Sequence, residues 1–114
     1  MIKLTMFETI NEFLMKLEGI SVQPHFEKIS YRIGKTIVAT YNESTFMFTV
    51  KLPLDDQESY SILYPNNVYP VPNNWGKLGW THVDIEGFQE TIILEIFYCS
   101  YREVAIKQKR LNKQ

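Results

Sequence analysis

The most constraining feature of this chain is the alternation of apolar and polar side chains between Ile29 and Leu52. Side chains on a strand point in turn to its two faces, so a period of two predicts strands with one buried face. Two turn signals, Gly34-Lys35 and Asn42-Glu43-Ser44, divide the alternation into three strands that should pair as antiparallel neighbours. We expect these strands over His25–Ile33, Thr36–Tyr41 and Thr45–Leu52, the third with Phe46, Phe48, Val50 and Leu52 facing inward.

Two registers are open to the first hairpin. A two-residue loop places Ile33 opposite Thr36, whereas a three-residue loop pairs Ile33 with Ile37. The longer loop also pairs Tyr31 with Ala39 and Ile29 with Tyr41. Register follows the buried face of a sheet, so the pairing of apolar with apolar residues favours the three-residue loop.

Three segments have the period of helices that bury one face. The first opens with Thr5 and Glu8, which match a capping box, and ends at Gly19, a residue type that commonly follows the last turn. Its apolar stripe contains Phe7, Ile10, Phe13, Leu14 and Leu17. The second helix is expected over Asp55–Leu63 and the third over residues 88–108.

The order of these elements predicts the fold class. Residues 64–74 are expected to be irregular, and a tight turn at Trp75–Trp80 leads into a strand over Trp80–Ile85. The order α-β-β-β-α-β(β)-α implies a two-layer α+β sandwich, a mostly antiparallel sheet with helices on one face. One domain should span residues 1–114. The open sheet face is then expected to carry Lys28, Arg32, Thr40, Met47, Thr49 and Lys51.

Composition indicates where in the cell the protein is expected. The apolar runs are far shorter than the roughly 18 residues of a membrane span, and no signal peptide is indicated, so no membrane partner is expected. Cys99 is the single cysteine, so no internal disulfide indicates an oxidising compartment, and the cytoplasm is the expected location.

Charge is distributed unevenly along the chain. Residues 1–106 carry 8 basic and 13 acidic residues, a net charge of −5, whereas the basic tail 107–114 carries a net charge of +4. Such a tail can contact phosphates or an acidic partner, but we favour its interpretation as a frayed, solvated helix end.

Two blocks of residues resemble a known family. The first block contains Leu17-Glu18-Gly19-Ile20, Pro24-His25-Phe26-Glu27, Ser30-Tyr31-Arg32, Gly34-Lys35 and Ala39-Thr40. The second contains Pro70, Pro72 and Trp75-Gly76-Lys77-Leu78-Gly79-Trp80-Thr81. Over roughly residues 7–110 the chain resembles the MmcQ/YjbR-like family, which implies a fold similar to CyaY and to secretion chaperones. DNA binding through wing-like hairpins is the activity suggested for that family.

The sequence offers no catalytic or metal-binding apparatus that we can identify. His25-x-Glu27 and His82-x-Asp84 could each place two ligands on one strand face, but a zinc site needs three or four ligands. Nucleophile elbows and glycine-rich phosphate loops are missing from the sequence. We therefore predict no catalytic residues, no metal and no cofactor. The alternative is an enzyme in which tertiary contacts bring His82, Asp84 and a hydroxyl together in a closed pocket.

Two kinds of surface residue are candidates for binding. The turn from Trp75 to Trp80 combines two indoles with Lys77. It is either a recognition loop or a structural turn in which one or both tryptophans fill the gap between the irregular segment and the helices. The cationic candidates are Lys28, Arg32, Lys35, Lys51 and Lys77. We predict a non-enzymatic interaction module that binds a protein partner or a second copy of itself. The alternative is a weak DNA-binding protein that uses the hairpin tips and the polar sheet face.

Overall fold

The computed structural model describes the backbone of residues 2–112 and the side chains of residues 6–24 and 26–110. Helices and strands alternate in the order helix, four strands, helix, strand, short helix, strand, helix. The elements are α1 (Ile2–Met15), β1 (Ile20–His25), β2 (Lys28–Ile33), β3 (Thr36–Asn42), β4 (Met47–Lys51), α2 (Leu54–Leu63), β5 (Val68–Pro70), α3 (Asn74–Lys77), β6 (Trp80–Asp84) and α4 (Glu90–Asn112).

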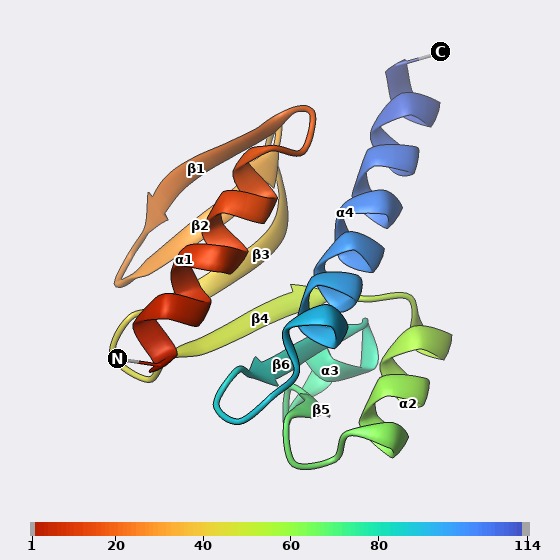
Figure 1. Cartoon of the computed structure of the whole chain (residues 1–114). Helices are drawn as coiled ribbons and strands as arrows, with labels where there is room; N and C mark the ends of the chain where they lie inside the picture. The colour runs from red at the N-terminus through yellow and green to blue at the C-terminus, as the bar shows by residue number, and fades with distance from the viewer. Residues whose placement is uncertain (1, 113–114) are drawn as a thin grey trace.

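The strands form one sheet in the order β1-β2-β3-β4-β6-β5, and every neighbouring pair is antiparallel. Helices α1 and α4 cross the same face of this sheet (Figure 1). Helix α2 packs beside α4, where the Tyr60 hydroxyl donates a hydrogen bond to Glu95. The predicted α+β sandwich, an antiparallel sheet with helices on one face, is confirmed.

Aromatic rings join the two layers. Phe7 of α1 lies 4.5 Å from Tyr41 of β3, measured between ring centroids, and Tyr41 lies 4.5 Å from Phe48 of β4. Phe97 of α4 meets Phe48 edge to face at 4.9 Å. Such geometries add about 0.5–1.5 kcal/mol per pair to the stabilisation that comes from burial. The aromatic cluster therefore holds both long helices against the centre of the sheet.

The strand predicted over His25–Ile33 begins too early. Residues 20–25 form the separate edge strand β1, which turns into β2 at Phe26. Phe26 has a φ of 59° and is 96% exposed. Pro24 is compatible with β1 because an edge strand does not need every backbone donor. The side chain of His25, one of the two possible ligands in His25-x-Glu27, lies outside the described residues.

The hairpin between β2 and β3 contains pairs from both of the possible registers. Its loop has two residues, so Ile33 faces Thr36, and the prediction of a three-residue loop is wrong. A β-bulge then shifts the register, and Tyr31 faces Ala39 as predicted. The bulge inserts one extra residue, which returns the apolar side chains to the buried face. Val38 occupies this position, and its carbonyl accepts a hydrogen bond from the Ser100 hydroxyl at 2.8 Å.

The inward position predicted for Phe46 is also wrong. Strand β4 begins one residue later, and Phe46 sits in the preceding turn with a φ of 59° and an exposure of 41%. Its N–H donates to the carbonyl of Asn42 at 2.8 Å, which closes the turn. Phe48, Val50 and Leu52 are buried as predicted.

The helix boundaries shift in both directions. Helix α1 already begins at Ile2, so Thr5 is not its N-cap, and the Thr5 side chain lies outside the described residues. Helix α2 matches its prediction to within one residue. Helix α4 begins at Glu90 and continues to Asn112, so residues 107–112 of the basic tail are helical. None of the described helices is long and apolar enough to cross a membrane.

Candidate functional site on the open sheet face

A row of polar side chains crosses the sheet face that α1 and α4 leave open. Thr40 on β3 lies opposite both Ser30 on β2 and Thr49 on β4. Thr49 in turn faces His82 on β6, which is paired with Tyr69 on β5. Directly opposite residues in antiparallel strands have neighbouring side chains. The row therefore runs from β2 to the edge strand β5.

Two hollows lie over this row, and their volumes are about 360 Å³ and about 320 Å³. Both are lined by Lys28, Thr40, Thr49 and His82. The first is completed by Ile37, Val71, Trp75 and Trp80, and the second by Asn42, Thr45, Met47 and Tyr69. Because they share four lining residues, the hollows form one feature, which we call the sheet-face groove.

Two glycines shape the loop that carries the tryptophans. A Cβ on Gly76 would lie 2.0 Å from the carbonyl oxygen of Val71, and one on Gly79 would lie 2.2 Å from that of Leu52. Only a residue without a side chain permits such close approaches. Trp75 is the second residue of α3, and its N–H donates at 2.8 Å to the side-chain oxygen of the N-cap residue Asn73.

The indole of Trp75 is 59% exposed at the rim of the groove, and Trp80 is half-buried in its wall. The alternative, in which one or both tryptophans fill the gap between the irregular segment and the helices, does not describe the exposed Trp75. The loop instead presents one indole to solvent and one to the groove.

Gln57 on α2 holds this loop in place, a role that was not predicted from the sequence. Its buried Nε2 lies 3.0 Å from the carbonyl of Gly76, 3.2 Å from that of Trp80 and 3.0 Å from the hydroxyl of Thr81. A glutamine within a polar helix gives no sequence signal for such a role, because the same residue is common on solvated faces.

His82 lies at the centre of the groove floor. Its Nδ1 is 2.9 Å from the hydroxyl of Thr49, and its ring meets the Tyr69 ring edge-on at 5.7 Å between centroids. Burial, with a smaller contribution from the charge of Lys28, lowers the pKa of His82 below its ordinary value. The neutral imidazole is therefore favoured, and it can donate from one ring nitrogen and accept at the other.

The predicted cations fall into two groups. Lys28 lines both hollows, and Lys51 is paired with Trp80 at one end of the groove. Arg32 is two residues from Ser30 on β2, and its Nε donates to the Ser30 hydroxyl at 2.9 Å. Lys35, in the β2–β3 turn, and Lys77, at the end of α3, are exposed and line neither hollow. The structure thus brings Lys28, Trp75 and Trp80 together, flanked by Arg32 and Lys51.

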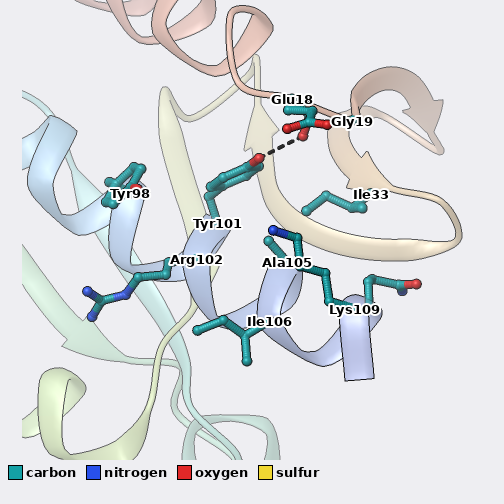
Figure 2. A pocket seen from close by; sticks show the side chains of 10 residues that line it. Glu18, Gly19, Ile33, Tyr98, Tyr101, Arg102, Ala105, Ile106 and Lys109 are labelled. Carbon is teal, nitrogen blue, oxygen red and sulfur yellow. Dashed lines mark hydrogen bonds between the residues drawn. The ribbon is translucent and has the colours of Figure 1, made fainter. Parts of the chain in front are cut away.

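A separate hollow of about 400 Å³ lies between α4 and the turn after α1. Figure 2 shows Tyr101 reaching from α4 to the backbone of Glu18, whose carbonyl accepts from the phenol at 2.7 Å. Nearby, the side chain of Gln108 donates to the hydroxyl of Thr36 at 2.8 Å. These bonds join α4 to the rest of the fold, so we interpret this hollow as structural.

Cys99 lies on α4 beside Tyr60, with its Sγ 3.9 Å from the phenol oxygen. Burial raises the pKa of the Cys99 thiol, and a protonated thiol is a poor nucleophile. Among the described residues no three His, Cys, Asp or Glu side chains are grouped as metal ligands.

The fold is shared with a solved protein. The crystal structure of protein DR2400 from Deinococcus radiodurans, which contains the domain DUF419, matches this one with a TM-score of 0.71. The match covers 83% of this chain and 75% of that chain, at 15% sequence identity. At that identity the likeness establishes the fold alone. No family model matches the chain, and no curated protein matches it in sequence. The protein is thus a small α+β domain of the fold seen in DR2400.

Proposed function

We propose that this protein is a non-catalytic binding module of the MmcQ/YjbR-like family, acting in the cytoplasm as one domain over residues 1–114. Its ligand is an extended segment of a partner protein, which lies in the sheet-face groove. The observation that carries this proposal is the pair of adjoining hollows, which share a polar floor and have the exposed indole of Trp75 at the rim. Exposed tryptophans are typical anchors of protein interfaces.

Charge favours a different protein over a second copy. Lys28, Arg32 and Lys51 all project from the open face. In a symmetric dimer the same patch occurs on both subunits, so these cations would face one another. Like charges across an interface cost affinity, which disfavours self-association through this face.

Nucleic acid is the second candidate, and the same three cations support it. The hairpin-tip cation Lys35 and the loop cation Lys77 do not extend the groove, however, and the chain carries a net charge of −1. Dedicated nucleic-acid-binding domains usually display a continuous basic surface. We therefore place DNA binding second to the binding of a protein segment.

A peptide-display selection tests the proposal. Random twelve-residue peptides are selected on the wild-type protein, and their affinities are then measured for Trp75→Ala and for the control Tyr98→Ala, which removes an exposed aromatic ring from α4. We expect Trp75→Ala to weaken binding about tenfold or more and Tyr98→Ala to leave it unchanged, since hot-spot truncations cost about 2 kcal/mol. Failure to select any peptide, or equal binding by the two variants, would contradict the proposal.

The alternatives are measured in parallel. Light scattering over a wide concentration range reports self-association, and we expect a monomer. Binding to duplex DNA is measured at low and at moderate salt, because phosphate contacts weaken steeply as salt rises. DNA binding that survives moderate salt and is lost in the double variant Arg32→Ala with Lys51→Ala would replace our proposal with the nucleic-acid function.

A further inference from the structure

Hydrogen-bond donors converge where the two hollows meet. The Lys28 ammonium, the Thr40 hydroxyl and the His82 imidazole line both of them. Within the described part of the chain, the side chains of Lys28 and Thr40 make no hydrogen bond or ion pair with the protein. These donors are thus available to a ligand.

Acidic side chains lie beside the groove, Asp84 opposite Met47 and Glu27 next to Lys28, but they do not line it. No Asp or Glu among the described residues lines either hollow, although the chain has 13 acidic residues. Asp84, two positions beyond His82 on β6, uses its Oδ1 to accept from the backbone N–H of Glu86 at 3.0 Å. Lys28 is thus the only charged side chain among the described residues that line the two hollows, and an anion is its complementary ligand.

His82 can join such a site without being charged. Its Nδ1 is engaged by Thr49, so a bound anion would favour the ring form in which Nε2 carries a hydrogen. A Lys28 ammonium and two neutral donors are a suitable set for one carboxylate, because charge-assisted hydrogen bonds are the strong ones.

The other lining residues of the first hollow are mostly apolar. They are Ile37, Val71, Trp75 and Trp80. A ligand that fills this hollow should therefore carry a carboxylate on one side and an apolar group on the other. In an extended chain, residues two positions apart point to the same side and are separated by roughly 6.6 Å, so one short segment can supply both groups.

We propose that the sheet-face groove contains a carboxylate subsite formed by Lys28, Thr40 and His82. It binds an Asp or Glu side chain of the partner segment, and an apolar side chain two residues along packs on Trp75 and Trp80. This inference rests on the proposed function, because it specifies the chemistry of the segment that the groove binds.

Two blocked pentapeptides test the subsite. Acetyl-Ala-Glu-Ala-Phe-Ala-amide has one carboxylate, and the Gln analogue has none. Each is titrated into the ¹⁵N-labelled full chain, with amide shifts of Thr40, Thr49 and His82 as the readout. We expect the Glu peptide to shift these resonances and to bind about tenfold more tightly than the Gln peptide, which corresponds to the loss of one charge-assisted bond.

Matched variants locate the carboxylate. Lys28→Gln should reduce the affinity for the Glu peptide to that for the Gln peptide, whereas Lys35→Gln removes an exposed lysine outside the groove and should change nothing. Equal affinities for the two peptides, or an affinity for the Glu peptide that Lys28→Gln does not change, would contradict the carboxylate subsite. Neither result would contradict the binding of a partner segment in the groove.

A third probe, 3-phenylpropionate, separates the subsite from the proposed function. We expect it to bind the same residues much more weakly than the Glu peptide, because it lacks the chain between the two groups. If it binds as tightly as the peptide, the carboxylate subsite stands and the proposed partner segment is wrong.

Discussion

The hydroxyl of Thr49 lies 2.9 Å from Nδ1 of His82, and this contact joins β4 to β6 on the sheet face away from the helices. It orients the only described histidine side chain towards two hollows that share Lys28. The pKa of His82 should therefore respond to a change in the charge of the groove, such as the loss of Lys28.

The titration of His82 should depend on Lys28. Burial is the larger cause of its lowered pKa and the Lys28 charge the smaller, so Lys28→Gln should raise this pKa without restoring its ordinary value. Lys35→Gln should leave it unchanged. Imidazole NMR signals followed from pH 4 to 8 measure both, and a pKa of His82 that is unaltered in Lys28→Gln would contradict the placement of Lys28.

The same shift predicts a loss of stability in acid. A lowered pKa in the folded state means that unfolded His82 binds protons first as the pH falls. The contribution is complete above about pH 6.5, the unfolded pKa, and is lost progressively as the pH falls through the folded pKa. We expect His82→Asn to show a smaller decrease in unfolding free energy over this range than the wild type, as measured by urea denaturation. A decrease of equal size would contradict the assignment.

Substitution of Gly79 should be much more harmful than substitution of Gly34. Both have positive φ, 108° and 59°, but only the Cβ at Gly79 would meet backbone, at Leu52. Gly34→Ala should cost about 1 kcal/mol for the left-handed conformation. Gly79→Ala must also displace a strand end, so we expect a loss of about 3 kcal/mol or more in chemical denaturation. Similar losses in the two variants would show that the close approach does not matter.

Gln57→Met should loosen the tryptophan loop. The substitution keeps the side-chain volume but removes the amide that donates to the carbonyls of Gly76 and Trp80 and to the hydroxyl of Thr81, and each lost hydrogen bond costs about 0.5–1.5 kcal/mol. We expect lower stability and faster hydrogen exchange at the amide of Gly79, which donates to the carbonyl of Gly76. Glu58→Met, at an exposed position on the same helix, is the control. Unchanged exchange in Gln57→Met would contradict the role of Gln57.

High pH should unfold the protein through two phenols. Burial raises the pKa of Tyr31 to about 12, and burial together with the bond to Glu95 raises that of Tyr60. A raised folded pKa gives stability that is complete below about pH 10 and is lost as the pH rises further. We expect Tyr60→Phe to reduce the fall in unfolding free energy that occurs as the pH rises above about 10. A fall as steep as that of the wild type would contradict this prediction.

Much of the fold was predictable because it depends on local pattern. Phe48 and Val50 alternate with polar neighbours, and burial of one face follows from that alternation alone. Strand β1 was missed because Ile20–His25 contains few apolar residues and a proline. An edge strand needs only one hydrogen-bonded neighbour, and its sequence is correspondingly weak in signal.

The candidate site was predicted only in part. Trp75 and Trp80 were identified by their local motif, and Lys28 by its place on the polar face, and all three line the groove. The contact of Thr49 with His82 spans 33 positions in the sequence, and no local pattern encodes such a distance. The same holds for Gln57, whose partners lie on the loop that it supports.

The amino-acid sequence alone determined which side chains face the helices and which face solvent, because that choice follows from the period of each segment. Only the tertiary structure decided the order of β4, β6 and β5, which places Thr49 beside His82 and His82 beside Tyr69. Strand order depends on long-range packing against α1 and α4, and packing is a property of the assembled core rather than of any one segment.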